Sequence, residues 1–201
     1  MTAKHRPSPL ALAVLGLLGA GPLHPYGMQR LIKLWGKDQV VNVGQRSNLY
    51  KTINRLRQDG LITVLQTERD QQFPERTVYE LTDAGRDAVL EWLTDMVSTP
   101  RNEFPELPAA LSFIMLLGPE QTLAVLERRA ALLGETVAGL DRDLAGYSGT
   151  IPRVTLLETE YARAVADAEL NWIKSVIDDL RTGSLTWSHA DFAGAATGYT
   201  S

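Results

Sequence analysis

Residues 42–81 read NVGQRSNLYKTINRLRQDGLITVLQTERDQQFPERTVYEL, and this stretch decides the fold. Its first half spaces three apolar residues, Leu49, Ile53 and Leu56, at intervals of four and three. At about 100° per residue, these side chains share one narrow arc of a helix. The pattern therefore predicts an amphipathic helix over residues 45–58, which Gly60 ends.

The opposite arc of this helix is polar and basic. It contains no acidic residue, and its members are Ser47, Asn48, Lys51, Asn54, Arg55 and Gln58. Arg46 lies in the first turn, the end of a recognition helix that enters the major groove, and Tyr50 lies on the flank toward the phosphates. These side chains bond phosphates or base edges. A lone basic arc is more often a solvated helix face, so its interpretation depends on the neighbouring segment of the chain.

A two-stranded ribbon comes directly after the helix. Residues 61–66 and 77–81 are rich in β-forming side chains, and the polar tip between them carries Arg69 and Arg76. A basic helix joined directly to such a ribbon predicts a winged helix-turn-helix, which contacts duplex DNA. Both arginines are expected to enter a minor groove or to pair with phosphates. The alternative is that they pair with the neighbouring Glu68, Asp70 and Glu75, and we favour DNA contact. The predicted DNA contacts are Arg46, Ser47, Asn48, Tyr50, Lys51, Arg55, Arg69 and Arg76.

Further helices complete this first domain. Helical patterns cover about residues 9–18 and 26–34 before the recognition helix, and about 83–97 after the wing, where Thr82 is a candidate cap. The apolar start of the first helix, behind a basic N-terminus, also resembles a secretory signal peptide. The amphipathic stretch that continues after it favours an interior helix.

Charge is distributed unevenly along the chain. The net charge is −4, which taken alone argues against a nucleic-acid partner. Residues 1–79, however, hold 11 lysines and arginines against 5 acidic residues, whereas residues 80–201 hold 9 against 19. A basic first part beside an acidic second part predicts a DNA-binding domain attached to a domain with another task.

The second part has helical patterns after a break at residues 98–105. Its first long helix has an a/d heptad pattern, and the residues expected to form this dimerisation seam are Leu123, Leu126, Leu133, Val137, Leu140 and Leu144. A last helix at about 154–181 carries on one side Leu157, Tyr161, Val165, Ala168, Trp172, Val176 and Leu180. The seam has two candidate partners, this last helix or a second copy of the chain. We expect part of it to be intermolecular, in a four-helix arrangement.

The sequence offers little for catalysis. Its only histidines, His5, His24 and His189, lack metal-ligand spacing, and GxSxG and P-loop motifs are missing. With no cysteine there is no disulfide, thiolate site or cysteine nucleophile. We therefore expect a cytoplasmic protein that is not an enzyme and uses no metal or cofactor. No segment reaches the roughly 18 apolar residues of a membrane span.

Aromatic residues are the candidates for an effector pocket. They are Trp92, Phe104, Phe113, Tyr161 and Trp172. Aromatic side chains at helical spacing are more often core residues than ligand contacts. Trp92 and Trp172 are the two that we consider for binding a small aromatic effector.

Three linked motifs resemble a known family. They are Gly-Pro-Leu-His-Pro-Tyr-Gly at 21–27, Asn-Leu-Tyr at 48–50 with Gly-Leu-Ile at 60–62, and Pro-Glu-Arg-Thr-Val-Tyr-Glu-Leu-Thr-Asp-Ala-Gly at 74–85. These motifs are similar to the PadR family of bacterial transcriptional regulators, over about residues 8–97. The resemblance implies a homodimeric winged-helix repressor, often relieved by a small aromatic or other effector.

The whole sequence thus predicts a mainly α protein with a small β-wing. The expected parts are a tail at 1–7, a winged helix-turn-helix domain at 8–98, an all-α dimerisation domain at 105–182 and a tail at 183–201. The expected partners are operator DNA, a second copy and a small aromatic effector. The alternative is a winged-helix module for protein contacts without DNA binding, and the salt dependence of binding distinguishes the two.

Overall fold

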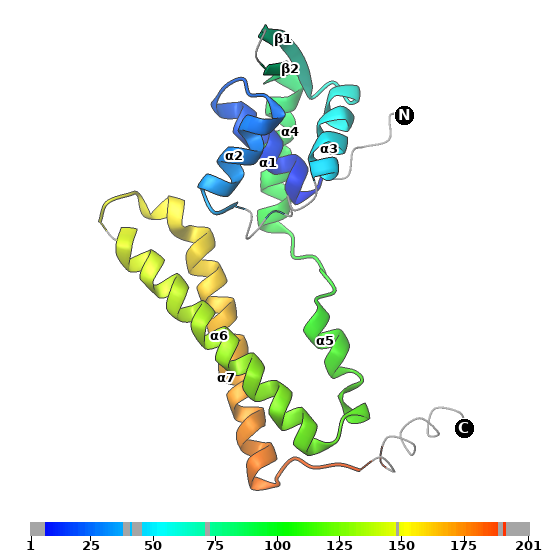
Figure 1. Ribbon diagram of the computed structural model, residues 1–201, viewed down its shortest axis with the longest axis vertical. Coiled ribbons are helices and arrows are strands. Elements are labelled where there is room, and N and C mark those ends of the chain that lie inside the picture. The colour runs from blue at the N-terminus through cyan, green and yellow to red at the C-terminus, as the bar shows by residue number, and fades with distance from the viewer. Residues whose placement is uncertain are drawn as a thin grey trace, which may run out of the picture. The chain divides into compact units, whose positions relative to one another are not determined.

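The computed structural model describes residues 7–37, 41, 46–70, 73–147, 149–188 and 191. The chain divides into two compact units, one on each side of the junction between Asn102 and Glu103. Helices dominate both units, and the strands of the described part form one two-stranded antiparallel sheet (Figure 1). The predicted fold class, mainly α with a small β-wing, is confirmed. The ends of both predicted tails, residues 1–6 and 192–201, lie outside the described residues.

The first unit is a winged helix-turn-helix built around one central helix. Its elements are α1 (Pro9–Ala20), α2 (Pro25–Leu34), α3 (Arg46–Gln58), β1 (Ile62–Asp70), β2 (Phe73–Leu81) and α4 (Asp83–Ser98). The central helix is α1, which contacts α3, α4 and β2. The apolar run that resembles a signal peptide forms α1, and Val14 and Leu15 within it are completely buried.

The core of this unit explains the orientation of α3. Leu49, Ile53 and Leu56, the predicted core face, are all at most 2% exposed and pack in one cluster with residues of α1, α2 and α4. Apolar side chains of this size each gain about 1.5–3 kcal/mol from full burial. Their burial therefore holds the opposite, polar arc of α3 at the surface.

The helix α3 ends in a turn that leads at once into the wing. Gly60 has a positive φ of 72°, and its N–H donates to the carbonyl of Arg57 at 3.0 Å. The N–H of Leu61 donates to the carbonyl of Leu56, also at 3.0 Å. This pair of bonds is the Schellman motif, which needs a left-handed residue that glycine adopts without strain.

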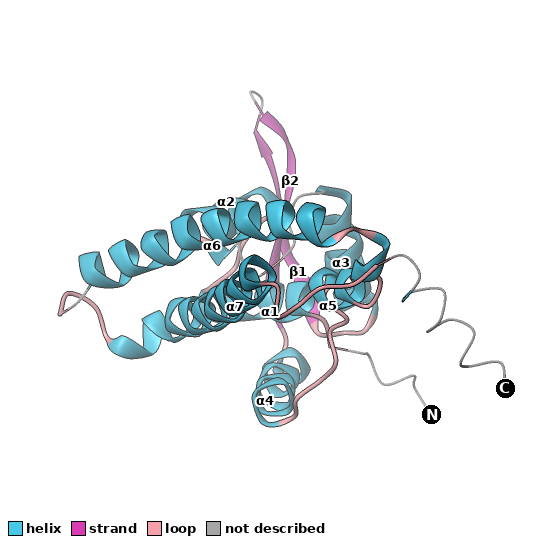
Figure 2. Ribbon diagram, turned by 90° about the horizontal axis from the view of Figure 1, so that it is seen from below, coloured by secondary structure: helices cyan, strands magenta, loops and turns pink. Residues whose placement is uncertain are grey.

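The wing is longer than the sequence predicts. Both strands have nine residues, and they pair antiparallel from Ile62 opposite Leu81 to Asp70 opposite Phe73. The ribbon extends away from the helices of its unit (Figure 2). The expected place of Arg69 and Arg76 in a tip is wrong, because both lie on strands and Arg76 stands opposite Glu68. The residues by which the strands exceed the prediction are mostly polar, and strand propensity read from composition does not identify a polar strand.

One threonine joins the wing, α3 and α4. The Thr82 hydroxyl donates to the carbonyl of Gly60 at 2.8 Å and accepts from the N–H of Gly85 at 3.0 Å. Its backbone N–H also donates to the carbonyl of Leu61 at 3.2 Å. Thr82 is thus the N-cap of α4, as predicted, and it also fastens that helix to the turn after α3.

The loop before α2 is fastened to the wing as well. Leu23 and Tyr79 exchange two backbone hydrogen bonds of 3.0 Å, which makes an isolated antiparallel bridge. Directly after this bridge, His24 caps α2, and its Nδ1 accepts from the N–H of Gly27 at 2.8 Å. The bridge to Tyr79 therefore fixes the position of the first turn of α2 relative to β2.

The second unit is a helical hairpin with a short helical approach. Its elements are α5 (Glu106–Leu111), η2 (Ile114–Leu116), α6 (Pro119–Tyr147), η3 (Arg153–Leu156) and α7 (Leu157–Thr182). The helices α6 and α7 pack side by side along their length (Figure 1). Residues 184–188 fold back on this unit, where the Trp187 indole N–H donates to the carbonyl of Leu117 at 2.9 Å.

The heptad seam of α6 packs on α7 of the same chain. Its contacts form two clusters, and the seam residues in them are Leu123, Leu126, Ala130, Leu133 and Val137. The α7 residues that they meet include Ala166, Leu170, Ile173 and Ile177. Of the two candidate partners, the intramolecular one therefore covers this part of the seam. Leu140 and Leu144 are half-buried and lie outside both clusters.

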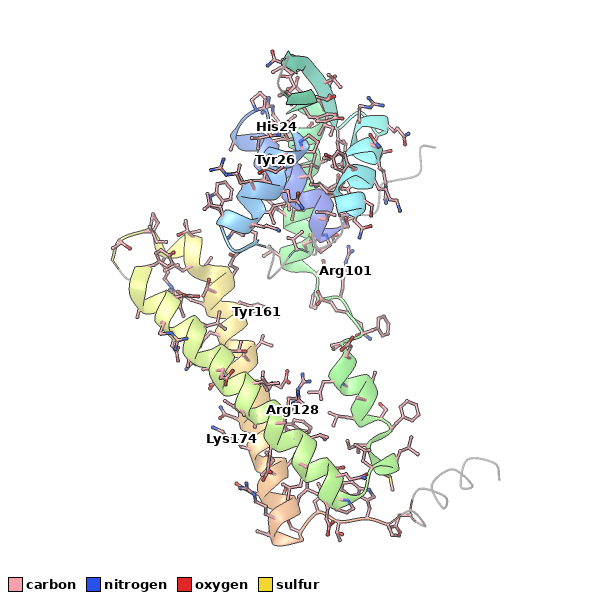
Figure 3. All side chains as sticks on the ribbon, in the orientation of Figure 1. His24, Tyr26, Arg101, Arg128, Tyr161 and Lys174 are labelled. Carbon is pink, nitrogen blue, oxygen red and sulfur yellow. The ribbon has the colours of Figure 1, made fainter. Side chains whose placement is uncertain are left out.

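The predicted apolar side of α7 is mostly not the side that packs on α6. Val176 and Leu180 do pack against the seam. Tyr161 (Figure 3), Val165 and Trp172, in contrast, are 72%, 47% and 44% exposed. The helix α7 thus carries two apolar stripes, and the predicted one is mostly the exposed one. Periodicity finds both stripes but does not say which one meets α6.

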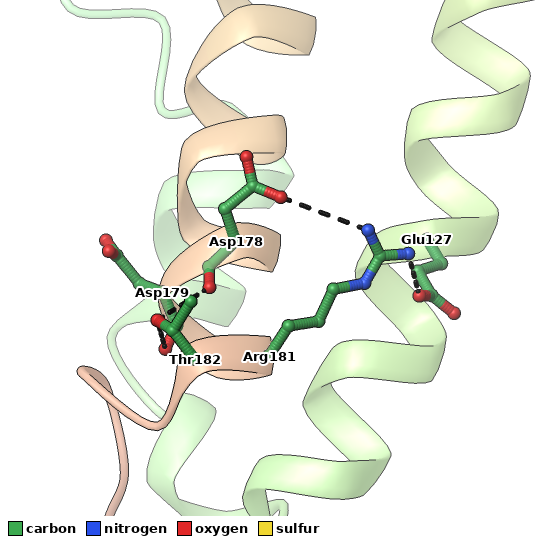
Figure 4. Close-up of polar contacts among 5 residues, drawn as sticks. All are labelled: Glu127, Asp178, Asp179, Arg181 and Thr182. Carbon is green, nitrogen blue, oxygen red and sulfur yellow. Dashed lines mark hydrogen bonds and ion pairs between the residues drawn. The ribbon is translucent and has the colours of Figure 1, made fainter.

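Ion pairs fix the antiparallel register of the hairpin. Three of them cross from α6 to α7: Glu127 to Arg181 at 2.7 Å, Arg129 to Glu169 at 2.6 Å, and Asp141 to Arg163 at 3.1 Å. Figure 4 shows Arg181 between Glu127 and Asp178. Exposed pairs of this kind contribute only about 0–1 kcal/mol each. They favour the one antiparallel register of α6 and α7 in which all three pairs form.

The start of α7 is held by a further pair. Arg153 in η3 donates to both carboxylate oxygens of Glu160, with the shorter bonds at 2.8 and 2.9 Å. This hydrogen bonding lowers the pKa of the Glu160 carboxyl below its ordinary value. The charged pair therefore persists into mildly acidic solution and weakens only as the carboxyl takes up a proton.

The close approach of α4 to the turn after α3 yields a stability prediction. A Cβ placed on Gly85 would lie 2.1 Å from the carbonyl oxygen of Leu61. We expect Gly85→Ala to lower the free energy of unfolding by about 1–3 kcal/mol, measured by urea or thermal unfolding. Gly16→Ala is the matched control, because nothing lies within 4 Å of a Cβ there and the helix gains about 0.5–1 kcal/mol. Equal stability of the two variants would contradict the packing described for α4.

Candidate nucleic-acid interface

The polar face of α3 is a continuous surface of hydrogen-bonding and basic side chains. Its exposed members are Ser47, Lys51, Asn54, Arg55 and Gln58, and Asn48 is half-buried. No acidic residue occurs on α3. The side chain of Arg46, which begins the helix, lies outside the described part. This polar face brings together four of the predicted contacts, Ser47, Asn48, Lys51 and Arg55.

The dimensions of α3 suit a groove of DNA. A helix of 13 residues is about 20 Å long, and the major groove is about 12 Å wide and admits one helix. Tyr50, another predicted contact, is 52% exposed. It lies on the same helix beside the polar face.

The wing supplies the remaining predicted contacts. Arg69 lies on β1 and Arg76 on β2, both beyond the part of the ribbon that packs on the helices. Their side chains lie outside the described part, so the structure gives their places on the strands alone. The ribbon follows α3 closely, because β1 begins four residues after α3 ends.

The sequence-based prediction missed two basic residues of α2. Arg30 and Lys33 are exposed on this helix, which contacts α3 and contains no acidic residue. Tyr26 in its first turn is 59% exposed (Figure 3). The first helix of a helix-turn-helix crosses the phosphate backbone, where such cations bind. The signal was present in the sequence, because residues 30–57 hold seven basic residues and one acidic residue.

The comparison with protein families identifies this unit. Residues 14–91 match the transcriptional regulator PadR-like family. Within the first unit, residues 14–91 therefore form a PadR-like domain. The match covers the helix-turn-helix, the wing and most of α4. No curated protein matches the chain.

Solved PadR structures share the fold. PadR of Bacillus subtilis in complex with operator DNA is 22% identical, covers 86% of this chain and 99% of its own, and superposes with a TM-score of 0.71. The same protein in complex with p-coumaric acid is 20% identical, covers 86% and 98%, and has a TM-score of 0.68. A PadR-like regulator of Bacillus cereus is 17% identical, covers 87% and 99%, and has a TM-score of 0.60. At these identities the likeness establishes the fold of this chain.

The hairpin of the second unit has an exposed apolar face. Val125, Arg129 and Leu132 follow one line on α6, at spacings of four and three. On α7, Val165, Glu169 and Trp172 follow one line in the same way. The Arg129–Glu169 ion pair joins these two lines, so they lie on the same side of the hairpin. We call this side the apolar face, and its exposed residues are Val125, Leu132, Tyr161, Val165 and Trp172.

The two candidate effector contacts lie in different units. Trp92 is 6% exposed and packs in the core of the first unit. Trp172 lies on the apolar face of the hairpin. The structure therefore places Trp92 where a large side chain fills the core, and only Trp172 is accessible to a small molecule.

The described part of the chain contains no group of three histidine or acidic side chains arranged to hold a metal ion. Two histidines, His5 and His189, lie outside the described residues. None of the described helices is long and apolar enough to cross a membrane.

Proposed function

We propose that this protein is a homodimeric repressor that binds operator DNA through α3 and the wing and leaves it when a small aromatic molecule binds. The observation that carries the proposal is the polar face of α3. It is exposed, basic and free of acidic residues, and its helix is joined directly to a ribbon that carries Arg69 and Arg76. Such a regulator works beside the chromosome, which places it in the bacterial cytoplasm, and its task requires no catalysis.

The roles of the DNA-binding residues follow from their places. Arg46 at the start of α3 and Ser47, Asn48, Lys51 and Arg55 along its polar face enter the major groove. Tyr50 binds a phosphate at its edge, and Arg69 and Arg76 on the wing contact the neighbouring minor groove or its phosphates. The solved complex of Bacillus subtilis PadR with operator DNA supports this use of the fold.

The test is the salt dependence of DNA binding. We expect the protein to bind duplex from the region flanking its own coding sequence, with log affinity falling linearly as log salt rises. Lys51→Ala with Arg55→Ala should lower the affinity at least tenfold and reduce the salt slope by about 2, because two phosphate or base contacts are lost. Fluorescence anisotropy at several salt concentrations measures both quantities.

The control removes a positive charge elsewhere. Arg128 is exposed on α6, so Arg128→Ala should leave DNA affinity and salt slope unchanged. If the double variant binds as the wild type does, α3 is not the recognition helix. If the wild type shows no salt-dependent binding at all, the winged helix is a protein-contact module.

The apolar face of the hairpin is the proposed dimer interface. Large apolar side chains at 44–72% exposure on two adjacent helices match the face that one hairpin offers another in a four-helix arrangement. The seam residues predicted from the sequence then form the intramolecular core beneath this interface. Leu126 and Val137 are among them. A dimer carries two copies of α3 and contacts two half-sites of an operator, which raises the affinity and specificity of DNA binding.

A substitution on the apolar face tests the dimer. We expect Trp172→Glu to convert the protein to a monomer and to weaken DNA binding, because a charge is costly inside an apolar interface. Sedimentation velocity measures the oligomeric state, and circular dichroism reports whether α6 and α7 remain helical. Asn171→Glu is the matched control, since this exposed neighbour points about 100° away on the helix. A Trp172→Glu variant that remains a dimer would exclude this face.

The effector proposed is a small aromatic acid. Bacillus subtilis PadR was solved with p-coumaric acid, and this chain shares its fold. We expect p-coumaric acid to reduce the affinity of the wild type for its DNA, measured by anisotropy at constant ionic strength. Benzoate without the phenol group and acetate at equal concentration are the controls. An equal effect of all three acids would contradict a specific effector site.

A further inference from the structure

The segment before α6 is folded but buries none of its helical residues. We call residues 103–117, which contain α5 and η2, the arm. Backbone hydrogen bonds join its turns, from the N–H of Ser112 to the carbonyl of Pro108 at 3.1 Å and from the N–H of Leu116 to the carbonyl of Phe113 at 3.0 Å. Within the described arm, neither α5 nor η2 has a buried residue. The arm is therefore a folded element whose apolar side chains stay at the surface.

The arm is too short to be stable by itself. Helices of fewer than about 12–15 residues are marginal in water and depend on packing, whereas α5 has six residues and η2 has three. Phe113 and Leu116 lie on one side of η2, since residues three apart are eclipsed in such a turn. They are 62% and 54% exposed. The apolar clusters of the described hairpin consist of α6 and α7 residues alone, so they leave this side of the arm open.

A second exposed apolar patch lies where α7 begins. It consists of Val154 in η3 and Leu157 and Tyr161 in α7, and we call these three residues the apolar tip. Their spacings of three and four place them along one line. They are 70%, 50% and 72% exposed. Tyr161 is also a member of the apolar face, so the tip continues that face to the end of the hairpin.

The folded arm does not reach the apolar tip of its own chain. Its last residue, Leu117, is fixed at the start of α6, because its carbonyl accepts from the indole N–H of Trp187 at 2.9 Å and α6 begins at Pro119. From there α6 rises about 43 Å to Tyr147 at the other end of the hairpin, whereas α5 is only about 9 Å long (Figure 1). The two patches therefore lie at opposite ends of the second unit.

We propose that the arm of each copy docks on the apolar tip of a second copy, with the two hairpins antiparallel. A two-fold axis across antiparallel hairpins brings each tip beside the partner's arm, so one contact is made twice and covers all four patches. This inference rests on the proposed homodimer and deepens it. It adds a contact at each end of the apolar face and defines the direction in which the hairpins pack.

The size of these patches suits a dimer contact. Aromatic side chains bury about 150–250 Å² each, so Phe113 and Tyr161 at their observed exposure offer about 200–330 Å² per copy. A stable interface buries about 800 Å² per partner. The two aromatic residues thus supply a substantial share of an interface whose centre is the apolar face.

Charge favours contact between arm and tip over contact between two arms. The arm has two acidic residues, Glu103 and Glu106, and no basic residue. Parallel hairpins would bring the two arms together, and four carboxylates with them. The tip, in contrast, lies beside Arg153, whose side chain is 79% exposed even in its pair with Glu160 and can also bind a carboxylate of the arm. Such pairs add little affinity, but they select one orientation.

The experiment uses the fact that each contact joins two different patches from two copies. Phe113→Asp places a charge in the arm and Leu157→Asp places one in the tip, and the full-length variants are studied alone and mixed. Both changes suit the local backbone, because Phe113 is the N-cap of η2 and Leu157 lies in the first turn of α7. Sedimentation velocity measures the dissociation constant of each dimer, native mass spectrometry measures the share of mixed dimers, and circular dichroism measures helix content. Phe113→Leu is the matched control.

Each variant alone carries the charge in both contacts of its dimer. We therefore expect its dissociation constant to rise about 100-fold or more, because a charge is costly inside an apolar contact. In the mixed dimer both charges fall in one contact and the other contact is intact. We expect the mixed dimer to be about tenfold tighter than the dimer of either variant, with contributions from the two distant contacts that add. Phe113→Leu should dimerise as the wild type does.

The outcomes separate this contact from the proposed homodimer. A mixed dimer no tighter than those of the two variants would overturn the proposal, since an arm packed on its own chain or on another arm gives that result. Unchanged dimerisation of either variant would also overturn it. A wild type that is monomeric at every concentration tested would instead overturn the proposed homodimer.

Discussion

The hydroxyl group of Thr82 connects the three elements on which DNA recognition depends. It donates to Gly60 at the end of α3 and accepts from Gly85 in the first turn of α4, while its own backbone bonds Leu61 at the start of the wing. Gly85 has no side chain, so α4 lies directly on this turn. The angle between α3 and the wing is therefore supported by hydrogen bonds of Thr82 and by the close contact of Gly85 with the backbone of Leu61. A recognition helix and a ribbon that reach two grooves of one duplex need such a fixed angle.

The structural features that were predictable from the sequence are those for which the sequence allows only one arrangement. Leu49, Ile53 and Leu56 share one arc of α3, and no other arc of that helix is apolar, so the core face and the polar face are determined together. Thr82 at the start of a helical pattern is a cap by its chemistry alone. The bridge between Leu23 and Tyr79 was not predictable, because it joins residues far apart in the chain through backbone groups that carry no sequence signal.

The sequence was a poor guide where it is compatible with two arrangements of the same segment. The outer half of the wing has polar side chains on both faces, and its strands are held by backbone pairing that composition does not report. On α7, the stripe through Tyr161 and Trp172 and the stripe through Leu170 and Ile173 are both apolar. Only packing decides between them, and it buries the second and exposes the first. The exposed stripe is informative for that reason, since a large apolar surface on a helix usually meets a partner.

The helical unit has a small core for its length. Along α6 and α7, with 29 and 26 residues, the buried apolar side chains are Leu126, Val137, Ala166, Leu170, Ile173 and Ile177. A two-helix hairpin with so few buried side chains gains little to offset the entropy of ordering two long helices, and its exposed ion pairs add little. A second hairpin on the apolar face would supply the missing burial. Folding of this unit and dimerisation are then one equilibrium, so its stability depends on protein concentration. The same equilibrium sets how often two copies of α3 are available to a two-fold operator.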